Sequence, residues 1–410
     1  MGQTTAGVSP DGKTYYNPVI NQNAPDPTII RSAKGRYYLY STEDSRHIPI
    51  YSSKDLVNWF LVGQAFSNED RPKWNTDAGA GLWAPDINLI NGKYVLYYSM
   101  SAWGGEWSCG IGVAVADNPL GPFKSPAGTN GNLLISRSIG VQNSIDPFYI
   151  EENGRKYLFW GSFRGIYAIE LTDDGLAIKP GAEKVRVAGT MIEGTYIKKH
   201  NGYFYLIGSA GSCCKGVNST YHLVMARSAD LLGPYVDKNG GRALDNHFSP
   251  LLNGSAEVAG PGHCSEIVED AEGQHWIMYH GYTKTNVSDE RKGFLDKVFW
   301  DADGWPYMTG MKPSTASPSP VIGPVTGIDE IDAPTCAWIN ITKHVQHDLC
   351  ISTTDGSAFK WQLIDTDGKT LKRGKAQGQV RVDSNDVRQG LYIVSVSGKH
   401  GKAIEKIIKY

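Results

Sequence analysis

The chain has 410 residues, of which 20% are charged, and its formal net charge is −2 at neutral pH. A nearly neutral chain carries no broad basic surface, which argues against a nucleic acid or another polyanion as its partner. No apolar run is long enough to cross a membrane as a helix. The first residues, MGQTTAG, lack the pattern of a signal peptide, so they give no information on export.

One pattern recurs along the chain: an acidic residue, a short apolar run, a polar turn with glycine, and a strand rich in Tyr and Trp. The third copy, Ser144–Ser162, reads SIDPFYIEENGRKYLFWGS. Each copy predicts a β-hairpin whose first strand begins beside a carboxylate. The acids of the successive copies are Asp26, Asp86, Asp146, Glu193 and Glu266.

The copies return about every 50–70 residues, a spacing typical of radial β-sheet arrays. We therefore predict an all-β fold in which residues 1–312 form a five-bladed β-propeller, closed by a strand at Tyr15–Pro18. If the repeated strand is the innermost of each blade, all five acids begin near the axis at one end. Crowded carboxylates repel one another and lose hydration, so this arrangement indicates a functional site.

Residues 313–330 are rich in Pro and Ser and are predicted to form a linker or an extended strap. Beyond them, residues 331–410 contain more basic than acidic residues and short alternating segments. These segments predict a small β-sandwich-like module with strands at Lys360–Ile364, Gln379–Val382, Leu391–Val396 and Ala403–Lys409. No group of acids, His or aromatics there suggests chemistry.

The six cysteines include no CxxC pair, which argues against a zinc site. Cys213 and Cys214 are adjacent, so on a strand they would face opposite sides and could not both be core residues. Cys336 and Cys350 could pair in a secreted chain.

Two carboxyl groups that face each other across a pocket can hydrolyse an acetal, one as acid and the other as base or nucleophile. Their environments must hold the two pKa values apart.

The motifs of this chain resemble those of glycoside hydrolase family 43 of clan F, over about residues 14–312. The motifs, in order, are APDP (24–27), WAPD (83–86), QNSIDP (142–147), IEGTY (192–196), GPGH (260–263) and DGWP (303–306).

This resemblance implies a five-bladed propeller with defined catalytic roles. Asp26 would be the general base, Glu193 the general acid, and Asp146 would orient Glu193 and raise its pKa. Hydrolysis would invert the anomeric centre, with the Asp26 and Glu193 carboxyls about 6.5–9.5 Å apart. His263 matches a position that faces a metal, usually calcium, largely through water, since calcium prefers oxygen ligands. We expect structural roles for the other two repeat acids, Asp86 and Glu266.

Five further residues are candidate sugar contacts. Trp83 and Trp103 flank the second repeat and could form a stacking wall, while most other aromatics are expected in strand cores. Asn143 and Ser162 flank the third acid, and Arg291 precedes a strand that returns to the axis.

The stretch GSCCKGVNSTYHLVMARS (211–228) resembles endo-1,5-α-L-arabinanases of this family, which favours arabinan as substrate. Those enzymes usually carry His before the first acid, where this chain has Pro25. Residues 291–306 also resemble β-xylosidases and α-L-arabinofuranosidases, so an exo-acting enzyme on arabinan or arabinoxylan is the alternative. A third possibility is a carbohydrate-binding propeller without activity.

The chain's last residues, 389–410, resemble C-terminal secretion domains of Bacteroidetes. This resemblance implies a secreted, periplasmic or cell-surface protein, a location that suits a plant cell-wall polysaccharide as substrate.

Overall fold

The computed structural model describes residues 7–285, 287–323, 339–342, 344–345, 348–365 and 369–409. The chain divides into two compact units, Met1–Gly327 and Ile328–Tyr410. Within the described residues, no helix is both long and apolar enough to pass through a membrane.

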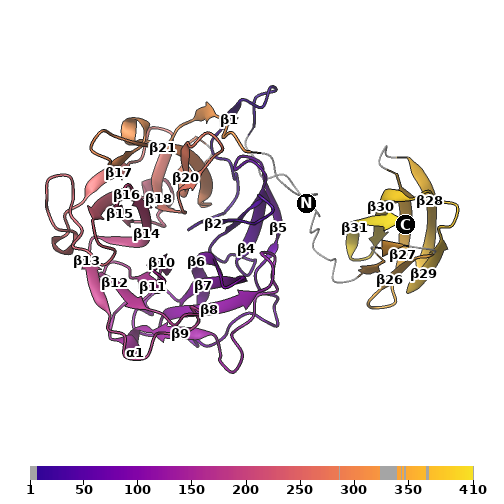
Figure 1. Ribbon diagram of the computed structural model, residues 1–410, viewed down its shortest axis with the longest axis horizontal. Coiled ribbons are helices and arrows are strands. Elements are labelled where there is room, and N and C mark those ends of the chain that lie inside the picture. Colours follow the sequence, from indigo (N-terminus) through magenta and orange to yellow (C-terminus); the bar gives the residue numbers. More distant parts are fainter. Residues whose placement is uncertain are drawn as a thin grey trace. The chain divides into compact units, whose positions relative to one another are not determined.

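The described part of the first unit contains five antiparallel sheets arranged around a common centre, so the predicted five-bladed propeller is confirmed (Figure 1). Successive strands pair in each blade, and the first strand of each lies nearest the centre. The first blade comprises β2(Thr28–Arg31), β3(Tyr37–Tyr40), β4(Pro49–Ser53) and β5(Trp59–Gln64). The second comprises β6(Gly81–Ile90), β7(Lys93–Ser101), β8(Gly110–Ala116) and β9(Asn132–Ile135). The third comprises β10(Phe148–Glu152), β11(Arg155–Trp160), β12(Ile166–Glu170) and β13(Val185–Ala188).

The fourth blade comprises β14(Ile192–His200), β15(Tyr203–Ala210), β16(His222–Ser228) and β17(Ser249–Leu252). The fifth comprises β18(Val258–Cys264), β20(His275–Thr283), β21(Lys292–Trp300) and β22(Pro306–Tyr307), with β19(Val268–Glu269) paired to β20. Among the described residues, helical structure is limited to four short segments in loops: α1(Ser136–Ile139), η1(Gly216–Asn218), η2(Ala243–Asp245) and η3(Thr309–Met311).

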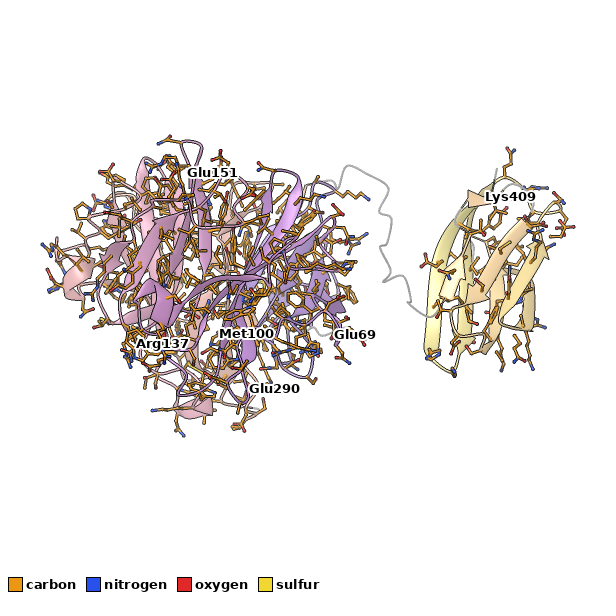
Figure 2. The ribbon with its side chains drawn as sticks, turned by 90° about the horizontal axis from the view of Figure 1, so that it is seen from below. Glu69, Met100, Arg137, Glu151, Glu290 and Lys409 are labelled. Carbon is orange, nitrogen blue, oxygen red and sulfur yellow. A yellow bond between two sulfur atoms is a disulfide. The ribbon has the colours of Figure 1, made fainter. Side chains whose placement is uncertain are left out.

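The second strand of each blade is the aromatic run of the repeat, and it is buried on both faces. All four residues of β3, YYLY, are buried, as are the last seven of β7. A strand covered by sheets on both sides reads as a continuous apolar run, which explains the Tyr and Trp content. Figure 2 shows the contrast between buried and peripheral positions: Met100 of β7 lies among the strands, whereas Glu151 lies at the periphery.

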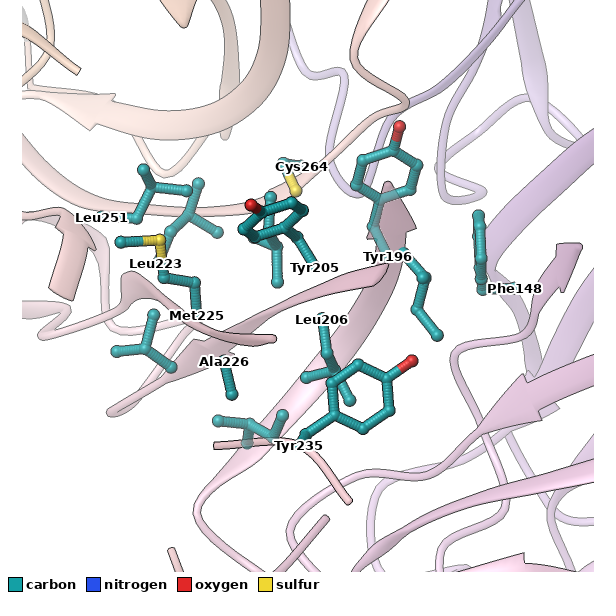
Figure 3. Packing of buried hydrophobic residues seen from close by; sticks show 14 of the residues in the cluster. Phe148, Tyr196, Tyr205, Leu206, Leu223, Met225, Ala226, Tyr235, Leu251 and Cys264 are labelled. Carbon is teal, nitrogen blue, oxygen red and sulfur yellow. The ribbon is translucent and has the colours of Figure 1, made fainter. Parts of the chain in front are cut away.

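The core consists of layers between neighbouring blades. One cluster joins the third, fourth and fifth blades, where Phe148 of β10 meets Tyr196 of β14 edge to face at 5.2 Å between ring centroids (Figure 3). Other clusters join the first blade to the second, the second to the third, and the fifth to the first. Each blade is therefore stabilised by burial against both neighbours, and the ring has no free sheet face.

The segment expected to close the ring at Tyr15–Pro18 lies outside the blade sheets. β1(Thr14–Tyr16) pairs with β23(Ala316–Pro318), while the Tyr15 hydroxyl donates to the carbonyl of Leu295 in the fifth blade. The first part of the Pro/Ser-rich stretch predicted at 313–330 is thus a strap against the propeller, one of the two forms predicted for it. Residues 324–330 of this stretch lie outside the described part of the chain.

The second unit has two sheets that share one apolar core, which agrees with the predicted β-sandwich-like module. β24(Ile339–Ile341), β26(Asp348–Thr353) and β29(Gln379–Asp383) form one sheet. The other contains β25(His344–Val345), β27(Ala358–Ile364), β28(Thr370–Gln377), β30(Gly390–Gly398) and β31(Gly401–Lys409). The predicted strands lie within β27, β29, β30 and β31, whereas β24, β25, β26 and β28 were not predicted. Cys336 of the possible Cys336–Cys350 pair lies outside the described residues.

The expectation that all five repeat acids begin at one end of the axis is wrong, because Asp86 and Glu266 lie two and three residues beyond the turn residues Ala84 and His263 of their blades. Glu266 accepts hydrogen bonds from the Thr28 hydroxyl at 2.7 Å and the Ile29 amide at 2.6 Å, which ties the fifth blade to the first. Asp86 accepts from the Tyr149 amide at 2.8 Å and ties the second blade to the third. The two acids therefore hold the ring together, as the structural role predicted for them requires.

Burial, together with the charge of Glu266, raises the pKa of Asp86 well above its usual range. Burial also raises the pKa of Glu266. The two side chains form a tightly coupled pair that favours retaining a proton, since two buried carboxylates cannot both ionise cheaply.

Replacing Glu266 should loosen the contact between the first and fifth blades. Glu266→Ala leaves two buried donors without this acceptor, each at a cost of about 1–3 kcal/mol. We expect the free energy of unfolding to fall by about 2–4 kcal/mol, measured by chemical denaturation. Glu266→Gln keeps an acceptor and should lose less; equal losses in the two variants would contradict this account.

Candidate active site

The site is built from one tight turn at the start of each blade. At equivalent places the five blades carry a residue with a positive φ, a conformation that is unfavourable for most side chains. These residues are Asp26 (54°), Ala84 (41°), Asp146 (59°), Gly194 (59°) and His263 (44°). Such conformations persist where the surroundings hold them, and they often mark functional positions.

Most of these turns are fixed by a side chain from the preceding blade. The Asp146 amide donates to Ser99 Oγ and the His263 amide to Ser209 Oγ, both at 2.8 Å. The Ala84 amide donates to Thr42 Oγ1 at 2.8 Å. These three acceptor residues lie at or near the ends of the aromatic second strands. The end of the propeller axis where the five turns meet is its mouth, and the positions of the residues there are set by contacts between blades, not within one hairpin.

Asp26 is buried and surrounded by cationic and polar groups. Arg291 Nη1 lies 2.9 Å from its Oδ1, and the Thr42 hydroxyl donates to its Oδ2 at 2.6 Å. The rings of His280 and His263 approach Oδ1 at 3.3 Å and 3.4 Å. Burial alone would raise the pKa of Asp26, but the Arg291 guanidinium and these histidines hold it well below its usual range. Asp26 is therefore an ionised carboxylate at neutral pH.

Glu193 lies in a less cationic part of the same mouth. It accepts hydrogen bonds from the Ser162 hydroxyl at 2.5 Å and the Tyr221 hydroxyl at 2.8 Å. Burial raises the pKa of Glu193, and the charge of Asp26 adds to this, although the two hydrogen bonds act in the opposite direction. An irregularity in the pairing of β14 with β15 follows Glu193, and such bulges re-aim a side chain at a sheet end.

The third acid, Asp146, contacts the backbone beside Glu193 and is influenced by the charge of Asp26. Its Oδ2 accepts the amide of Gly194 at 3.0 Å, so it holds the backbone next to Glu193. Burial, followed by the charges of Glu193 and Asp26, raises the pKa of Asp146 well above its usual range. Asp146 and Glu193 thus form a buried pair in which the neutral form is favoured, whereas Asp26 favours the charged form.

Two aromatic side chains that the sequence analysis missed link the acids. His280 is fully buried, and its Nδ1 accepts the amide of Asp26 at 3.1 Å. Its ring stacks on Tyr221 with 5.7 Å between centroids and an interplanar angle of 15°, and Tyr221 in turn donates to Glu193. This stack fixes the orientation of both acids relative to one another.

The sequence carried a signal for one of these residues. A hydroxyl residue follows the aromatic run in four repeats, at Thr42, Ser99, Ser162 and Ser209, and the fifth repeat has His280 there. Each of the five contacts the first strand or turn of the next blade. A comparison of this position among the repeats would have identified His280.

The structure places three of the five predicted sugar contacts among the acids. Arg291 pairs with Asp26, Ser162 donates to Glu193, and Asn143 donates to Ser162 Oγ at 2.9 Å. Trp83 and Trp103 pack together with 5.6 Å between ring centroids, and 81% of Trp103 is exposed. Contacts of these five residues with a sugar stay predictions.

The donors around His263 do not form a calcium site of protein oxygens. Its Nδ1 faces Asp26, whose oxygens already contact Arg291 and Thr42. Among the described residues, no group of three or more His, Cys, Asp or Glu side chains could hold a metal. A calcium ion at His263 stays a prediction that would require ligation mainly by water. The hydrolysis steps proposed for Asp26 and Glu193 do not depend on it.

A propeller that holds, at one mouth, a carboxyl whose pKa is lowered and others whose pKa is raised has the groups of a glycosidase. Sequence comparison agrees: the family model of glycosyl hydrolases family 43 matches residues 15–306, and the chain belongs to this family. A second model, the secretion system C-terminal sorting domain, matches residues 344–410.

Relatives of known activity include both modes of attack. The chain is 33% identical, over 69% of its length and 85% of the relative's, to the extracellular exo-α-(1→5)-L-arabinofuranosidase ArbA of Cellvibrio japonicus. It is 32% identical, over 70% and 88%, to the extracellular endo-α-(1→5)-L-arabinanase 1 of Bacillus subtilis.

Among solved structures, an α-L-arabinanase of Cellvibrio cellulosa complexed with arabinohexaose matches with a TM-score of 0.63 and 31% identity. The match covers 70% of this chain and 96% of that one. The protein is therefore a glycosidase, and the resemblance noted from its motifs is confirmed.

The tyrosine next to the candidate acid offers a test of the electrostatics. A hydroxyl that donates to Glu193 favours its charged form, so removing it should raise the pKa of Glu193 further. If Glu193 acts as an acid, Tyr221→Phe should shift the alkaline limb of the pH profile of kcat/KM to higher pH and reduce kcat about tenfold.

Tyr235→Phe is the matched control, because Tyr235 is a buried tyrosine of the same part of the chain that donates only to the Leu231 carbonyl at 2.6 Å. It should leave the profile in place. An unchanged profile in Tyr221→Phe would contradict the proposed environment of Glu193.

Proposed function

We propose that this enzyme hydrolyses the α-1,5-linked L-arabinofuranosyl bonds of arabinan by single displacement with inversion. The observation that carries the mechanism is that Asp26 and Glu193 lie at one mouth in opposite environments: Arg291 pairs with Asp26 and lowers its pKa, whereas burial raises the pKa of Glu193. The choice of arabinan is supported by the names of the relatives, which include exo- and endo-acting enzymes on (1→5)-linked arabinose.

In this mechanism Asp26 accepts a proton from the attacking water. Arg291 and Thr42 hold its oxygens and keep the carboxylate ionised, which leaves a lone pair available at neutral pH. A base must remain charged in the resting enzyme, and the Arg291 guanidinium provides this even though the side chain is buried.

Glu193 donates its proton to the leaving glycosidic oxygen as the bond to the anomeric carbon breaks. Asp146 positions it through the Gly194 amide and limits the negative charge that the pair can carry. Inversion requires room for water between base and sugar, so we expect the Asp26 and Glu193 carboxyls about 6.5–9.5 Å apart.

Removing either group should abolish catalysis without unfolding the protein. General acid–base catalysis contributes about 10²–10⁴-fold, so Asp26→Asn and Glu193→Gln should each lower kcat on arabinan by at least about 100-fold. Asp86→Asn is the matched control: it changes a buried axial acid whose carboxyl favours the neutral form. If Asp26→Asn or Glu193→Gln cleaves as fast as the parent, this assignment fails.

The products identify the substrate and the mode of attack. Linear arabinan should be cleaved and xylan should not, and proton NMR of the first product should show the anomer opposite to that of the substrate. Early oligosaccharides indicate endo action, and arabinose alone indicates the exo-acting alternative. Retention of configuration would contradict the proposed mechanism.

We also propose that the C-terminal unit directs the enzyme to the cell surface or the medium, where arabinan occurs. The match of residues 344–410 to a secretion sorting domain supports this. Deletion of residues 328–410 should keep the enzyme inside the cells of the source organism, as measured by activity in the cell and medium fractions; release of the truncated enzyme would argue against it.

A further inference from the structure

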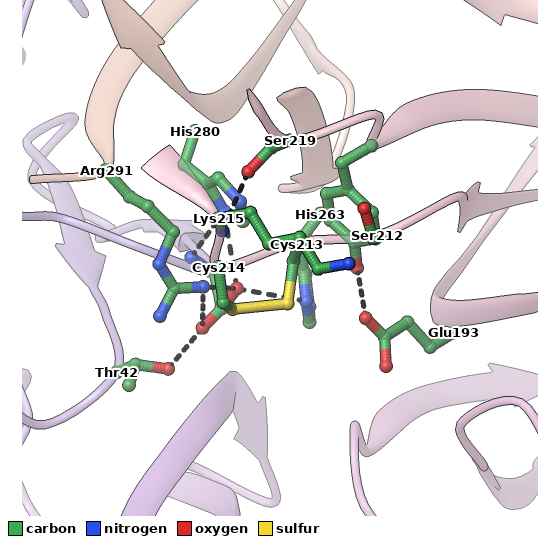
Figure 4. Close-up of a disulfide and its surroundings, with 12 residues drawn as sticks. Thr42, Glu193, Ser212, Cys213, Cys214, Lys215, Ser219, His263, His280 and Arg291 are labelled. Carbon is green, nitrogen blue, oxygen red and sulfur yellow. Dashed lines mark hydrogen bonds and ion pairs between the residues drawn. A yellow bond between two sulfur atoms is a disulfide. The ribbon is translucent and has the colours of Figure 1, made fainter. Parts of the chain in front are cut away.

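The doubled cysteine forms a disulfide between adjacent residues, Cys213 and Cys214. It lies in the loop between β15 and β16, whose two ends belong to the site. Before the loop, Ser209 accepts the amide of His263; after it, Tyr221 donates to Glu193. Figure 4 shows the disulfide with Glu193, His263 and Arg291 among its surroundings.

The loop is held in one conformation by bonds across its base. The Ser212 amide donates to Thr220 Oγ1 at 3.0 Å, and the Thr220 amide returns a bond to the Ser212 carbonyl at 3.1 Å. The Lys215 amide donates to Ser219 Oγ at 3.0 Å. The disulfide is thus presented by a fixed loop, with Cys213 partly exposed and Cys214 exposed.

Stability does not explain this bond. A disulfide stabilises mainly by restricting the unfolded chain, and its effect grows with the length of the loop it closes. Cys213 and Cys214 are one residue apart, so the bond closes almost no loop. The bond instead locks the two side chains into a small, rigid ring, which is closed by the S–S bond and the peptide bond between the two residues. The sulfurs and the Cβ atoms form its apolar edge.

Such a ring is an apolar element among polar neighbours on this side of the mouth. The labelled side chains around it are charged or polar, among them Arg291, Glu193 and Ser219. Trp103, which is exposed, packs on the partly buried Trp83. This pair belongs to the second blade, whereas the disulfide belongs to the fourth, so the third blade lies between them. Sugar sites combine a few polar groups with apolar surface for the C–H faces of the rings.

Resting on the proposed function, we infer that the Cys213–Cys214 disulfide is a wall of the substrate site that packs against the apolar face of the pentose ring bound between Asp26 and Glu193. Polarisable sulfur makes favourable dispersion contacts. Because the ring is already rigid, the contact costs little conformational entropy on binding. Its effect is on substrate binding and positioning, and it takes no part in proton transfer.

The kinetic test is the double variant Cys213→Ser with Cys214→Ser on arabinohexaose. Loss of an apolar contact of this size corresponds to about tenfold, so we expect KM to rise about tenfold while kcat stays within about twofold and the pH profile does not move. Asn218→Ala, an exposed position of the same loop, is the control and should leave KM unchanged. An unchanged KM, or a loss confined to kcat, would overturn the inference.

Reduction of the parent enzyme gives the same answer if the double variant folds poorly. Treatment with a phosphine reductant, followed by thiol titration, should raise KM reversibly as the two thiols appear. If the thiols appear and KM stays constant, the disulfide is not a substrate wall.

Protection from reduction tests the contact without catalysis. In Asp26→Asn, arabinohexaose should slow the reduction of Cys213–Cys214 several-fold, and cellohexaose should not. Equal rates with and without arabinohexaose, at a concentration shown by calorimetry to saturate the variant, would refute the wall. Cleavage by Asp26→Asn as fast as by the parent would instead count against the catalytic assignment, so the two failures can be told apart.

Discussion

The structure depends on how the carboxyl groups along the propeller axis are kept from repelling one another. Burial favours the neutral form of each acid, and one guanidinium reverses this for Asp26 alone. Arg291 pairs with Asp26, and it lowers the pKa of Asp146 and Glu193 less than burial raises it. The same fold therefore carries at one mouth a carboxyl that favours the charged form and a pair that favours the neutral form, the condition that acid–base hydrolysis requires.

A second constraint is that no blade builds its part of the site alone. The turn that presents Asp146 is fixed by Ser99 of the preceding blade, and the turn of Asp26 is fixed by His280 across the closure of the ring. Further along the axis, Glu266 ties the fifth blade to the first in a similar way. Closure of the ring and geometry of the site are consequently one property, because a shift of one blade moves its neighbour's acid.

We propose that the loops adapt this common mouth to a substrate. The tryptophan pair of the second blade and the disulfide of the fourth are apolar surfaces on either side of the third blade, which carries Asp146. Both lie outside the hydrogen bonds that hold the acids. Substrate preference can therefore change in these loops while the acid–base machinery stays constant, which agrees with exo- and endo-acting relatives that share this fold.

The sequence by itself determined the all-β propeller, the second module and the three acids, because the repeat pattern is local: an acid, a turn and an aromatic strand lie within one hairpin. It did not determine that Asp86 and Glu266 lie further along the axis, since a displacement of two or three residues from the turn is visible only when the blades are compared in register. Nor did it reveal that Arg291 pairs with Asp26, or that Cys213 and Cys214 join beside Glu193. These contacts link residues far apart in the chain or depend on the path of a loop, and only closure of the ring brings them together.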